Sequence, residues 1–354
     1  MAFCTEELKL YQLVSDQRPV LSDSRTLILT QLSDGEFHTG TSLAMQLGIS
    51  RAAVWKHIQH LRQQGVPIGS VHGKGYCLDH ELEFLERDTI LQYMPPRITS
   101  QVVLEVLPLV SSTNDWLGQL RTAGVSPGQV CLAEQQTTGR GTQGRQWQSP
   151  LAANLYLSFY WRFRQSPMEL GGLSLAIAVS VVEQLAAIGV NGLSIKWPND
   201  IYLGQGKAGG ILVDISGETT GPSDLIIGIG LNYNMPVTVR KQIDQQVADI
   251  SDDKVGSQIG RNQLAAIVIE AIFDSCTRFA AKGFAGFYER WTRWDRVFDR
   301  PVSLSLGNHL IEGIAQGVDE NGSICLSTDS GRRCYASGEV SLRERGTIHD
   351  QFVD

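Results

Sequence analysis

The pattern of hydrophobic and polar positions divides the chain into three regions. In the first region, apolar residues recur at helical spacing in three short segments, and we predict helices over residues 26–32, 41–47 and 51–64. Thr41 and Ser50 are expected N-caps, and Gly48 supplies the turn between the second and third helices. Two apolar runs around a glycine turn then follow within residues 68–78 and indicate a hairpin. Together these elements predict a winged helix-turn-helix domain over residues 25–85.

In the second region, residues 86–298, segments with a period of two alternate with segments of helical period. This alternation predicts a mixed α/β domain, and a linker with a connecting helix is expected over residues 79–100. We expect strands over residues 102–107, 129–135, 154–163, 194–196, 201–203, 208–215 and 225–231. We expect helices over residues 113–120, 168–188, 262–281 and 284–294.

The third region, residues 299–346, contains only short strand patterns separated by turn signals. The expected strands cover residues 302–306, 310–318, 323–326, 332–335 and 340–342. Asp319-Glu320-Asn321-Gly322 is typical of a hairpin turn. We therefore predict a separate small β-barrel, whereas residues 1–24 form an extension of unknown role.

Charge supports a DNA-binding function for the first domain. The whole chain has a net charge of −7, which argues against generic nucleic-acid binding. However, residues 38–77 contain no Asp or Glu, and they include four Lys or Arg and four His. The alternative is a small helical adaptor with a solvated basic face. A metal on His57 and His60 would need further ligands, and none is nearby in the sequence. The candidate DNA contacts are Ser50, Arg51, Lys56, His57, Arg62 and Lys74.

The cysteines and the apolar runs indicate in which cellular environment the protein is expected. Its six cysteines are scattered, without a C-x-x-C pair, and we expect reduced thiols in a cytoplasmic protein. No basic segment precedes an apolar run at the N-terminus, so no signal peptide is expected. The longest apolar run, near residues 171–182, is too short to span a bilayer, and we expect no membrane association.

One glycine-rich segment, residues 139–147 (GRGTQGRQW), stands out as candidate chemistry. Glycines let backbone N–H groups approach a ligand closely, and arginine suits carboxylate or phosphate groups. The segment is not a P-loop, because no G-K-S/T ends it and a strand pattern follows it. Taken alone, it is equally compatible with a surface turn that carries solvated arginines. Its composition indicates a loop that closes over an anion.

Four further groups in the same region carry polar residues. They are Ser112-Thr113-Asn114 at a strand-to-helix junction, Lys196-Trp197-Pro198-Asn199-Asp200, Lys207-Ala208-Gly209-Gly210, and Asn232 at the end of an apolar strand. The first group could also be a plain helix N-cap. Two lysines, two arginines and an aspartate indicate a site for a polyphosphate and a metal. No histidine occurs between His80 and His309, which favours catalysis by positioning and charge stabilisation.

These motifs, in this order and spacing, resemble those of biotin protein ligases. Ser112-Thr113-Asn114, GRGTQGRQW, KWPND and KAGGILVD carry the likeness, and the N-terminal domain is similar to that of the bifunctional type, the biotin operon repressor. The resemblance implies a biotin/lipoate ligase-like catalytic domain and an SH3-like C-terminal barrel. It also implies synthesis of biotinyl-5′-AMP from biotin and ATP with Mg²⁺. Biotin would then pass to a lysine of the biotin carboxyl carrier protein of acetyl-CoA carboxylase.

The resemblance also implies roles for individual residues. Lys207, Lys196 and Arg140 would be catalytic, and Asp200 would hold the metal. The residues implied to bind biotin are Ser112, Thr113, Asn114, Gln136, Gly139, Arg140, Lys207 and Gly210. Those implied to bind ATP or the adenylate are Gly141, Thr142, Gly144, Arg145, Trp147, Lys196, Asn199, Asp200, Asn232 and Arg343.

The family resemblance further implies that the adenylate is a corepressor, which promotes homodimerisation and binding to operator DNA. One departure is Thr142, because a basic residue usually follows Gly-Arg-Gly in this family. Its absence weakens the expected retention of the adenylate unless Arg145, or an arginine outside the loop, compensates. Three alternatives are lipoate–protein ligation, a regulator that only senses a ligand, and a ligase that no longer binds DNA.

Overall fold

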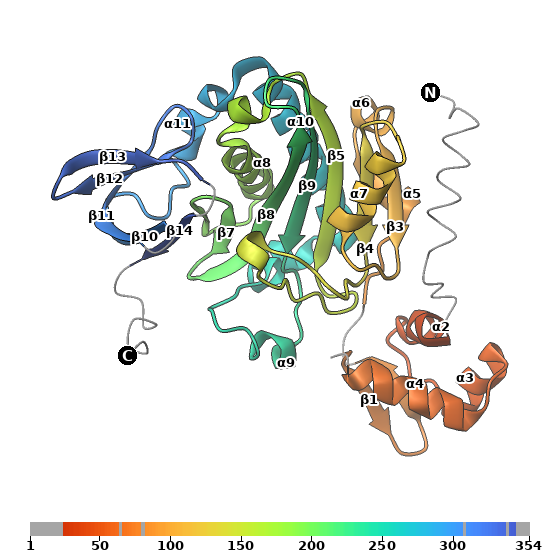
Figure 1. Cartoon of the computed structure of the whole chain (residues 1–354). Coiled ribbons are helices and arrows are strands. Elements are labelled where there is room, and N and C mark those ends of the chain that lie inside the picture. Colours follow the sequence, from red (N-terminus) through yellow and green to blue (C-terminus); the bar gives the residue numbers. More distant parts are fainter. Residues whose placement is uncertain (1–23, 64–65, 79–81, 307–308, 338–339, 345–354) are drawn as a thin grey trace.

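The computed structural model describes residues 24–63, 66–78, 82–306, 309–337 and 340–344. The N-terminal helices lie below one end of the central sheet in Figure 1, and the C-terminal strands lie beyond its other end. The three sheets therefore correspond to the three regions that the sequence pattern separates.

Three helices and a hairpin form the N-terminal domain. The helices are α2 (Ser24–Leu32), α3 (Gly40–Leu47) and α4 (Arg51–Gln63), and β1 (Ile68–Val71) pairs antiparallel with β2 (Gly75–Leu78). The N-cap of α3 is Thr39 rather than the expected Thr41, because the Thr39 side chain accepts the Ser42 N–H at 3.0 Å. Gly48 ends α3 with φ 64°, and Ser50 caps α4 through the Ala53 N–H, as expected. Helix α4 ends at Gln63, and the expected last residue, Gln64, lies outside the described residues.

The central domain is built on a seven-stranded sheet in the order β3-β4-β5-β9-β8-β7-β6. Only β3 and β4 pair in parallel; the other neighbours are antiparallel. The strands are β3 (Val103–Leu107), β4 (Gln129–Ala133), β5 (Leu155–Phe163), β6 (Leu193–Lys196), β7 (Asp200–Leu203), β8 (Gly206–Gly217) and β9 (Ser223–Leu231). The mixed α/β domain is confirmed, and β8 extends beyond the expected bounds at both ends.

Helices cover both faces of this sheet. On one face α8 (Leu173–Ala187) and α10 (Arg261–Lys282) pack on each other and form the largest apolar core. On the other face lies α7 (Thr113–Thr122), whose Trp116, Leu117 and Leu120 contact a smaller cluster. The remaining helices are the short segments α5 (Arg87–Tyr93), α6 (Pro96–Thr99), α9 (Val237–Arg240) and α11 (Tyr288–Trp291).

Two expected helices are shorter than the sequence suggested. The predicted helix over residues 168–188 is divided into a 3-10 turn (Pro167–Leu170) and α8, because Gly172 adopts φ 76° between them. The predicted helix over residues 284–294 reduces to a 3-10 turn (Phe284–Gly286) and α11, because Phe287 between them has the non-helical φ of −124°. In the described part of the chain, one segment, Pro167–Ala187, has the length and apolarity of a membrane span. It is 67% buried inside the protein, as a core helix is.

The C-terminal domain is an antiparallel five-stranded sheet in the order β13-β12-β11-β10-β14. Its strands are β10 (Pro301–Leu306), β11 (His309–Val318), β12 (Ile324–Thr328), β13 (Gly331–Tyr335) and β14 (Val340–Glu344). The expectation that all cysteines are reduced is wrong for Cys325 and Cys334. These residues face each other across β12 and β13 and form a disulfide. Their separation of nine residues gave no signal, since only the hairpin register brings them together.

A buried arginine joins the linker between the first two domains to the residues that flank the glycine-rich segment 139–147, called the glycine loop below. Arg261 is 1% exposed and forms an ion pair with Glu134 at 2.9 Å. The Arg261 backbone N–H and the Asn262 side chain donate to the carboxylate of Glu83, in the linker. Glu134 also accepts the Leu85 N–H at 2.5 Å. One guanidinium thus neutralises a buried carboxylate where the linker meets the sheet.

We predict that Arg261→Met lowers the free energy of unfolding by about 3–5 kcal/mol, because it leaves the Glu134 carboxylate buried without its cation. Urea unfolding measures this change. Arg97→Met is the matched control, because Arg97 pairs with Glu270 and Asp274 at the surface and is 48% exposed. The control is expected to cost less than about 1 kcal/mol. Equal losses in the two variants would contradict this role for Arg261.

Candidate functional site

A pocket lies over β8 and β9, below the glycine loop. Its wall brings together residues from four segments that are far apart in the sequence. The predicted site residues that line it are Ser112, Thr113, Asn114, Gln136, Arg140, Gly141, Thr142, Trp147, Asn199, Asp200, Lys207 and Gly210. The sequence motifs therefore converge on one site.

The amino end of α7 supplies a network of neutral hydrogen-bonding groups. The Thr113 backbone N–H and hydroxyl both donate to the Gln136 side-chain oxygen, at 2.9 and 3.2 Å. The Ser158 hydroxyl lies 2.7 Å from the Thr113 hydroxyl and 2.5 Å from the Asn114 amide oxygen. Ser112 caps the helix, so the alternative of an N-cap is also correct. These fixed donors and acceptors suit an uncharged polar head group.

Gly228 has to be glycine for this network to fit. A Cβ at this position would lie 2.3 Å from the Asn114 amide oxygen. Glycine in β9 therefore lets the α7 network approach the sheet closely.

The glycine loop folds back over the cavity. The Trp147 backbone N–H donates to Gly139 O at 2.8 Å, and the Gly141 backbone N–H donates to Arg145 O at 2.7 Å. The Trp147 indole rests on the backbone of Gly230, where an added Cβ would meet it at 2.5 Å. Its Nε1 is buried and has no hydrogen-bond partner. This segment therefore lies as a lid over Gly230, with the indole donor enclosed beneath it.

Each of two cations in the cavity is paired with an acidic side chain. Lys207 Nζ lies 2.7 Å from Asp200 and 5.7 Å from the centre of the Trp147 ring. Arg140 Nη2 lies 2.7 Å from Asp115 and 2.9 Å from Asp214. An anionic ligand must therefore compete with these carboxylates or draw the cations away from them.

The sequence interpretation missed Asp115 and Asp214. Asp115 follows the Ser-Thr-Asn motif, and Asp214 ends the KAGGILVD motif. The Asn114 side chain donates to the Asp214 carboxylate at 3.0 Å, which joins α7, β8 and the loop. Their positions at the ends of these two motifs were the available signal. Nothing in the sequence indicated that both carboxylates pair with Arg140.

Several expected site residues do not line the cavity. Arg145 is exposed, and its side chain donates to the Gln143 side chain at 2.8 Å. Lys196 Nζ lies 6.0 Å from the Tyr202 ring centre.

The Asn232 amide donates to Lys207 O and Ala248 O, and thus supports the strand behind Lys207. Gly139 is buried behind Gln136, and Gly144 is exposed at the outer turn of the loop. The Arg343 side chain lies outside the described residues, although its backbone pairs with Ser303.

The predicted DNA contacts mostly lie on α4 and the hairpin. Arg51, Lys56 and Lys74 are exposed, Ser50 is the exposed N-cap of α4, and His57 is half-buried. Arg62 differs, because its Nε donates to Ile68 O at 2.8 Å and so holds β1 against α4. Sequence reasoning missed Trp55, whose side chain is 57% exposed on α4. An exposed indole on this helix adds an apolar contact surface to the basic one.

Comparisons with known proteins agree with this arrangement. Residues 106–232 match the biotin/lipoate A/B protein ligase family, which assigns the class of the central domain. Residues 24–77 match an HTH domain, and residues 297–343 match the biotin protein ligase C-terminal domain. The chain is 39% identical over 326 residues to the bifunctional ligase/repressor BirA of Salmonella typhimurium, covering 89% of this chain and 96% of that protein.

Two further likenesses support the assignment. The Escherichia coli BirA is 38% identical over 319 residues, covering 89% of this chain and 96% of that protein. The Aquifex aeolicus biotin protein ligase, solved in complex with biotin and ATP, has a TM-score of 0.58 and 31% identity. It covers 68% of this chain and 98% of that one. The chain belongs to the family of bifunctional biotin protein ligases and repressors.

A buried acid behind the Lys207 strand makes stability depend on pH. Burial raises the pKa of Asp249 to about 6, although the Met235 N–H and Arg240 favour its charged form. The folded state therefore binds this proton more tightly than the unfolded state does. The stabilisation is present below about pH 4 and is lost as pH rises through about 6.

We predict that Asp249→Asn removes this dependence. Relative to the variant, the wild-type chain should lose up to about 3 kcal/mol of unfolding free energy between pH 4 and pH 7. Chemical unfolding at several pH values measures the difference. A difference between the two proteins that stayed constant over this range would refute the assignment.

Proposed function

We propose that this chain activates biotin with ATP to form biotinyl-5′-AMP and then biotinylates one lysine of the biotin carboxyl carrier protein of acetyl-CoA carboxylase. The observation that carries the proposal is the convergence of Lys207, Arg140 and the Thr113–Gln136 network on one cavity. Neutral donors and cations in one site suit a ligand with a polar ring at one end and a carboxylate at the other.

In the first step, the biotin carboxylate attacks the α-phosphate of ATP and pyrophosphate leaves. Carboxylate and triphosphate repel each other, so their charges must be compensated before they can meet. Lys207 is only 12% exposed, and its cation is held in place by Asp200 and the Trp147 ring. Arg140 provides a second cation from the loop once an anion displaces Asp115 and Asp214. Catalysis would then rest on positioning and charge, without a histidine base.

The acidic side chain of Asp200 fits a magnesium ion. Mg²⁺ is usually held by one or two carboxylates together with substrate phosphates. Asp200 lies on the cavity wall and is 23% exposed, beside the amide of Asn199. Bound Mg²⁺ would supply charge neutralisation at the phosphates, and Lys207 would keep the carboxylate oriented. The Asn199 side chain meanwhile donates to Ile211 O, which fixes the turn that carries Asp200.

In the second step, the acceptor lysine attacks the acyl carbon of the adenylate, an amide forms, and AMP leaves. The mixed anhydride is sensitive to water, so it needs a cover between the two steps. The glycine loop with Trp147 supplies this cover over Gly230. For Arg343 we propose a role in handling ATP or the acceptor, within a C-terminal domain of the SH3-like type.

The second function that we propose is repression at operator DNA, with biotinyl-5′-AMP as corepressor. The exposed cations of α4 and the hairpin around Lys74 support a winged helix-turn-helix that binds phosphates. An adenylate-dependent homodimer would place two such domains on a two-fold symmetric site. The substrates and the DNA partner both suit a cytoplasmic protein.

The ligase activity is tested with protein, ATP·Mg²⁺, biotin and a carrier domain, by the mass increase of the carrier. Lys207→Gln should slow this reaction by about 10²–10³-fold, because an aligned charge is lost from the transition state. Lys254→Gln removes an exposed lysine and is the matched control. Lipoate in place of biotin should give no product. Equal rates in the two variants, or modification by lipoate alone, would overturn the proposal.

A cation at position 142 should strengthen adenylate retention. Thr142 lines the cavity beside Arg140, and Arg145 points to Gln143 instead. We predict that Thr142→Arg slows dissociation of biotinyl-5′-AMP by about tenfold, the value of one charged hydrogen bond. Gln146→Arg adds the same charge at an exposed position of the loop and should leave the rate unchanged. Stopped-flow measurement of biotinyl-5′-AMP release from preformed complexes distinguishes the two variants. Identical release rates for Thr142→Arg and the wild type would exclude the effect.

A further inference from the structure

The disulfide of the C-terminal domain joins one buried and one exposed sulfur. Cys325 lies on β12 with no exposed surface, and Cys334 lies opposite it on β13 and is exposed. Strand β13 is at the edge of its sheet, so one side of this strand has no neighbouring strand. A thiolate from solution can therefore reach the Cys334 sulfur, with Cys325 as the leaving group.

The other described cysteines are poorly suited to such chemistry. Burial raises the pKa of Cys131 and Cys276 well above the usual range, and both are fully buried. Cys77 is half-buried on β2, in another domain. Thiol chemistry in the described part of the chain is therefore concentrated at the pair in β12 and β13.

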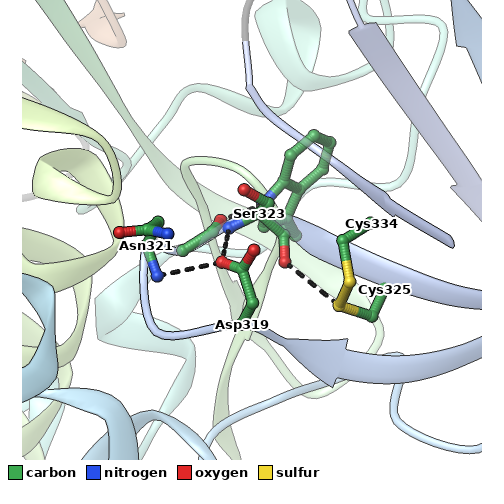
Figure 2. Close-up of a disulfide and its surroundings, with 7 residues drawn as sticks. Asp319, Asn321, Ser323, Cys325 and Cys334 are labelled. Atoms are coloured by element: carbon green, nitrogen blue, oxygen red, sulfur yellow. Dashed lines mark hydrogen bonds between the residues drawn. A yellow bond between two sulfur atoms is a disulfide. The ribbon is translucent and has the colours of Figure 1, made fainter. Parts of the chain in front are cut away.

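The pair is adjacent to a tight turn, as Figure 2 shows. The Asp319 carboxylate accepts the Asn321 and Ser323 N–H groups, both at 2.9 Å. The Cys325 sulfur lies 3.8 Å from the Ser323 carbonyl oxygen, to which its thiol form can donate. A change of oxidation state therefore occurs in direct contact with this turn.

This turn is also the joint between the C-terminal and central domains. The Trp197 indole N–H donates to Gly322 O at 2.9 Å, and Trp197 is 1% exposed. A Cβ added at Gly322 would lie 2.6 Å from Gly172 Cα, at the start of α8. Trp197 is three residues before Asp200, the partner of Lys207. The disulfide is thus linked through one turn to the segment that positions the cavity's lysine.

We propose that Cys325 and Cys334 form a reversible thiol–disulfide exchange site whose oxidation state sets the order of the Asp319–Ser323 turn against Trp197. A thiolate of a small thiol compound attacks the Cys334 sulfur, and the bond to Cys325 breaks. Cys325 leaves with the electron pair and takes up a proton. A second thiol then resolves the mixed disulfide, so that the protein gains two electrons and the thiol compound becomes its disulfide.

The test measures exchange and its structural effect separately from ligase activity. The protein is equilibrated with reduced and oxidised glutathione in varied ratios, trapped by alkylation and digested for mass spectrometry. Hydrogen exchange is then followed in peptides that contain the turn and Trp197. Cys334→Ser removes the exposed sulfur and should resemble the reduced wild type. Peptides from β3 and β4 serve as the internal control.

We expect the pair to titrate reversibly while Cys131 and Cys276 stay unlabelled. The turn should exchange about tenfold faster in the reduced form and in Cys334→Ser, since a cross-link no longer restrains the hairpin. Three results would overturn the proposal. The first is that glutathione leaves the oxidation state of the pair unchanged, and the second is that the turn shows equal hydrogen exchange in both states. The third is zinc uptake by the reduced pair together with Asp319, whose oxygen lies within 4.8 Å of both sulfurs. Loss of ligase activity in every form would contradict the proposed function but not this site.

Discussion

A guanidinium that is removed from water needs counter-charges and hydrogen-bond acceptors, and the two Nη atoms of Arg261 obtain them from the segments that the protein has to hold together. Its Nη1 donates to the Glu83 carbonyl and pairs with Glu134, and its Nη2 donates to Asn154 O. Glu134 is two residues before Gln136, and its carbonyl accepts the Ala152 N–H. Both ends of the glycine loop are therefore tied to the linker. Leu151, at the far end of the loop, also packs against the apolar core of the helix-turn-helix domain.

The site itself depends on a balance of charge that the same scaffold maintains. In the free protein the carboxylates of Asp200, Asp115 and Asp214 compensate the cations of Lys207 and Arg140. These pairs are partly exposed, so water and salt weaken them, and an anionic ligand can compete for the cations. The neutral network around Thr113 has no such flexibility, because Gly228 and Ser158 fix it against the sheet. A rigid neutral end and an exchangeable charged end together describe an acyl-adenylate site.

Most of the architecture could be predicted from the sequence, because it follows from local signals. Periodicity gave the order of helices and strands, and glycine positions such as Gly48 and the hairpin at Gly322 gave the turns. The motifs also identified most of the cavity wall. Long-range pairings could not be read in this way. The partners of Arg261 and Arg140 and the disulfide at Cys334 depend on which strands and loops meet, and no local pattern encodes that. The contact between the Arg145 and Gln143 side chains is local, but no residue pattern announced it either.

We propose that ligand binding at the cavity changes DNA binding by the helix-turn-helix domain, whose core contacts Leu151 beyond the glycine loop. The most direct test measures binding of the chain to its operator by fluorescence anisotropy, with biotin and ATP·Mg²⁺ supplied together or singly. We expect both substrates together to raise the affinity, because the proposed corepressor, biotinyl-5′-AMP, then forms at the site. An affinity that is the same with both substrates, with either alone and with none would contradict it.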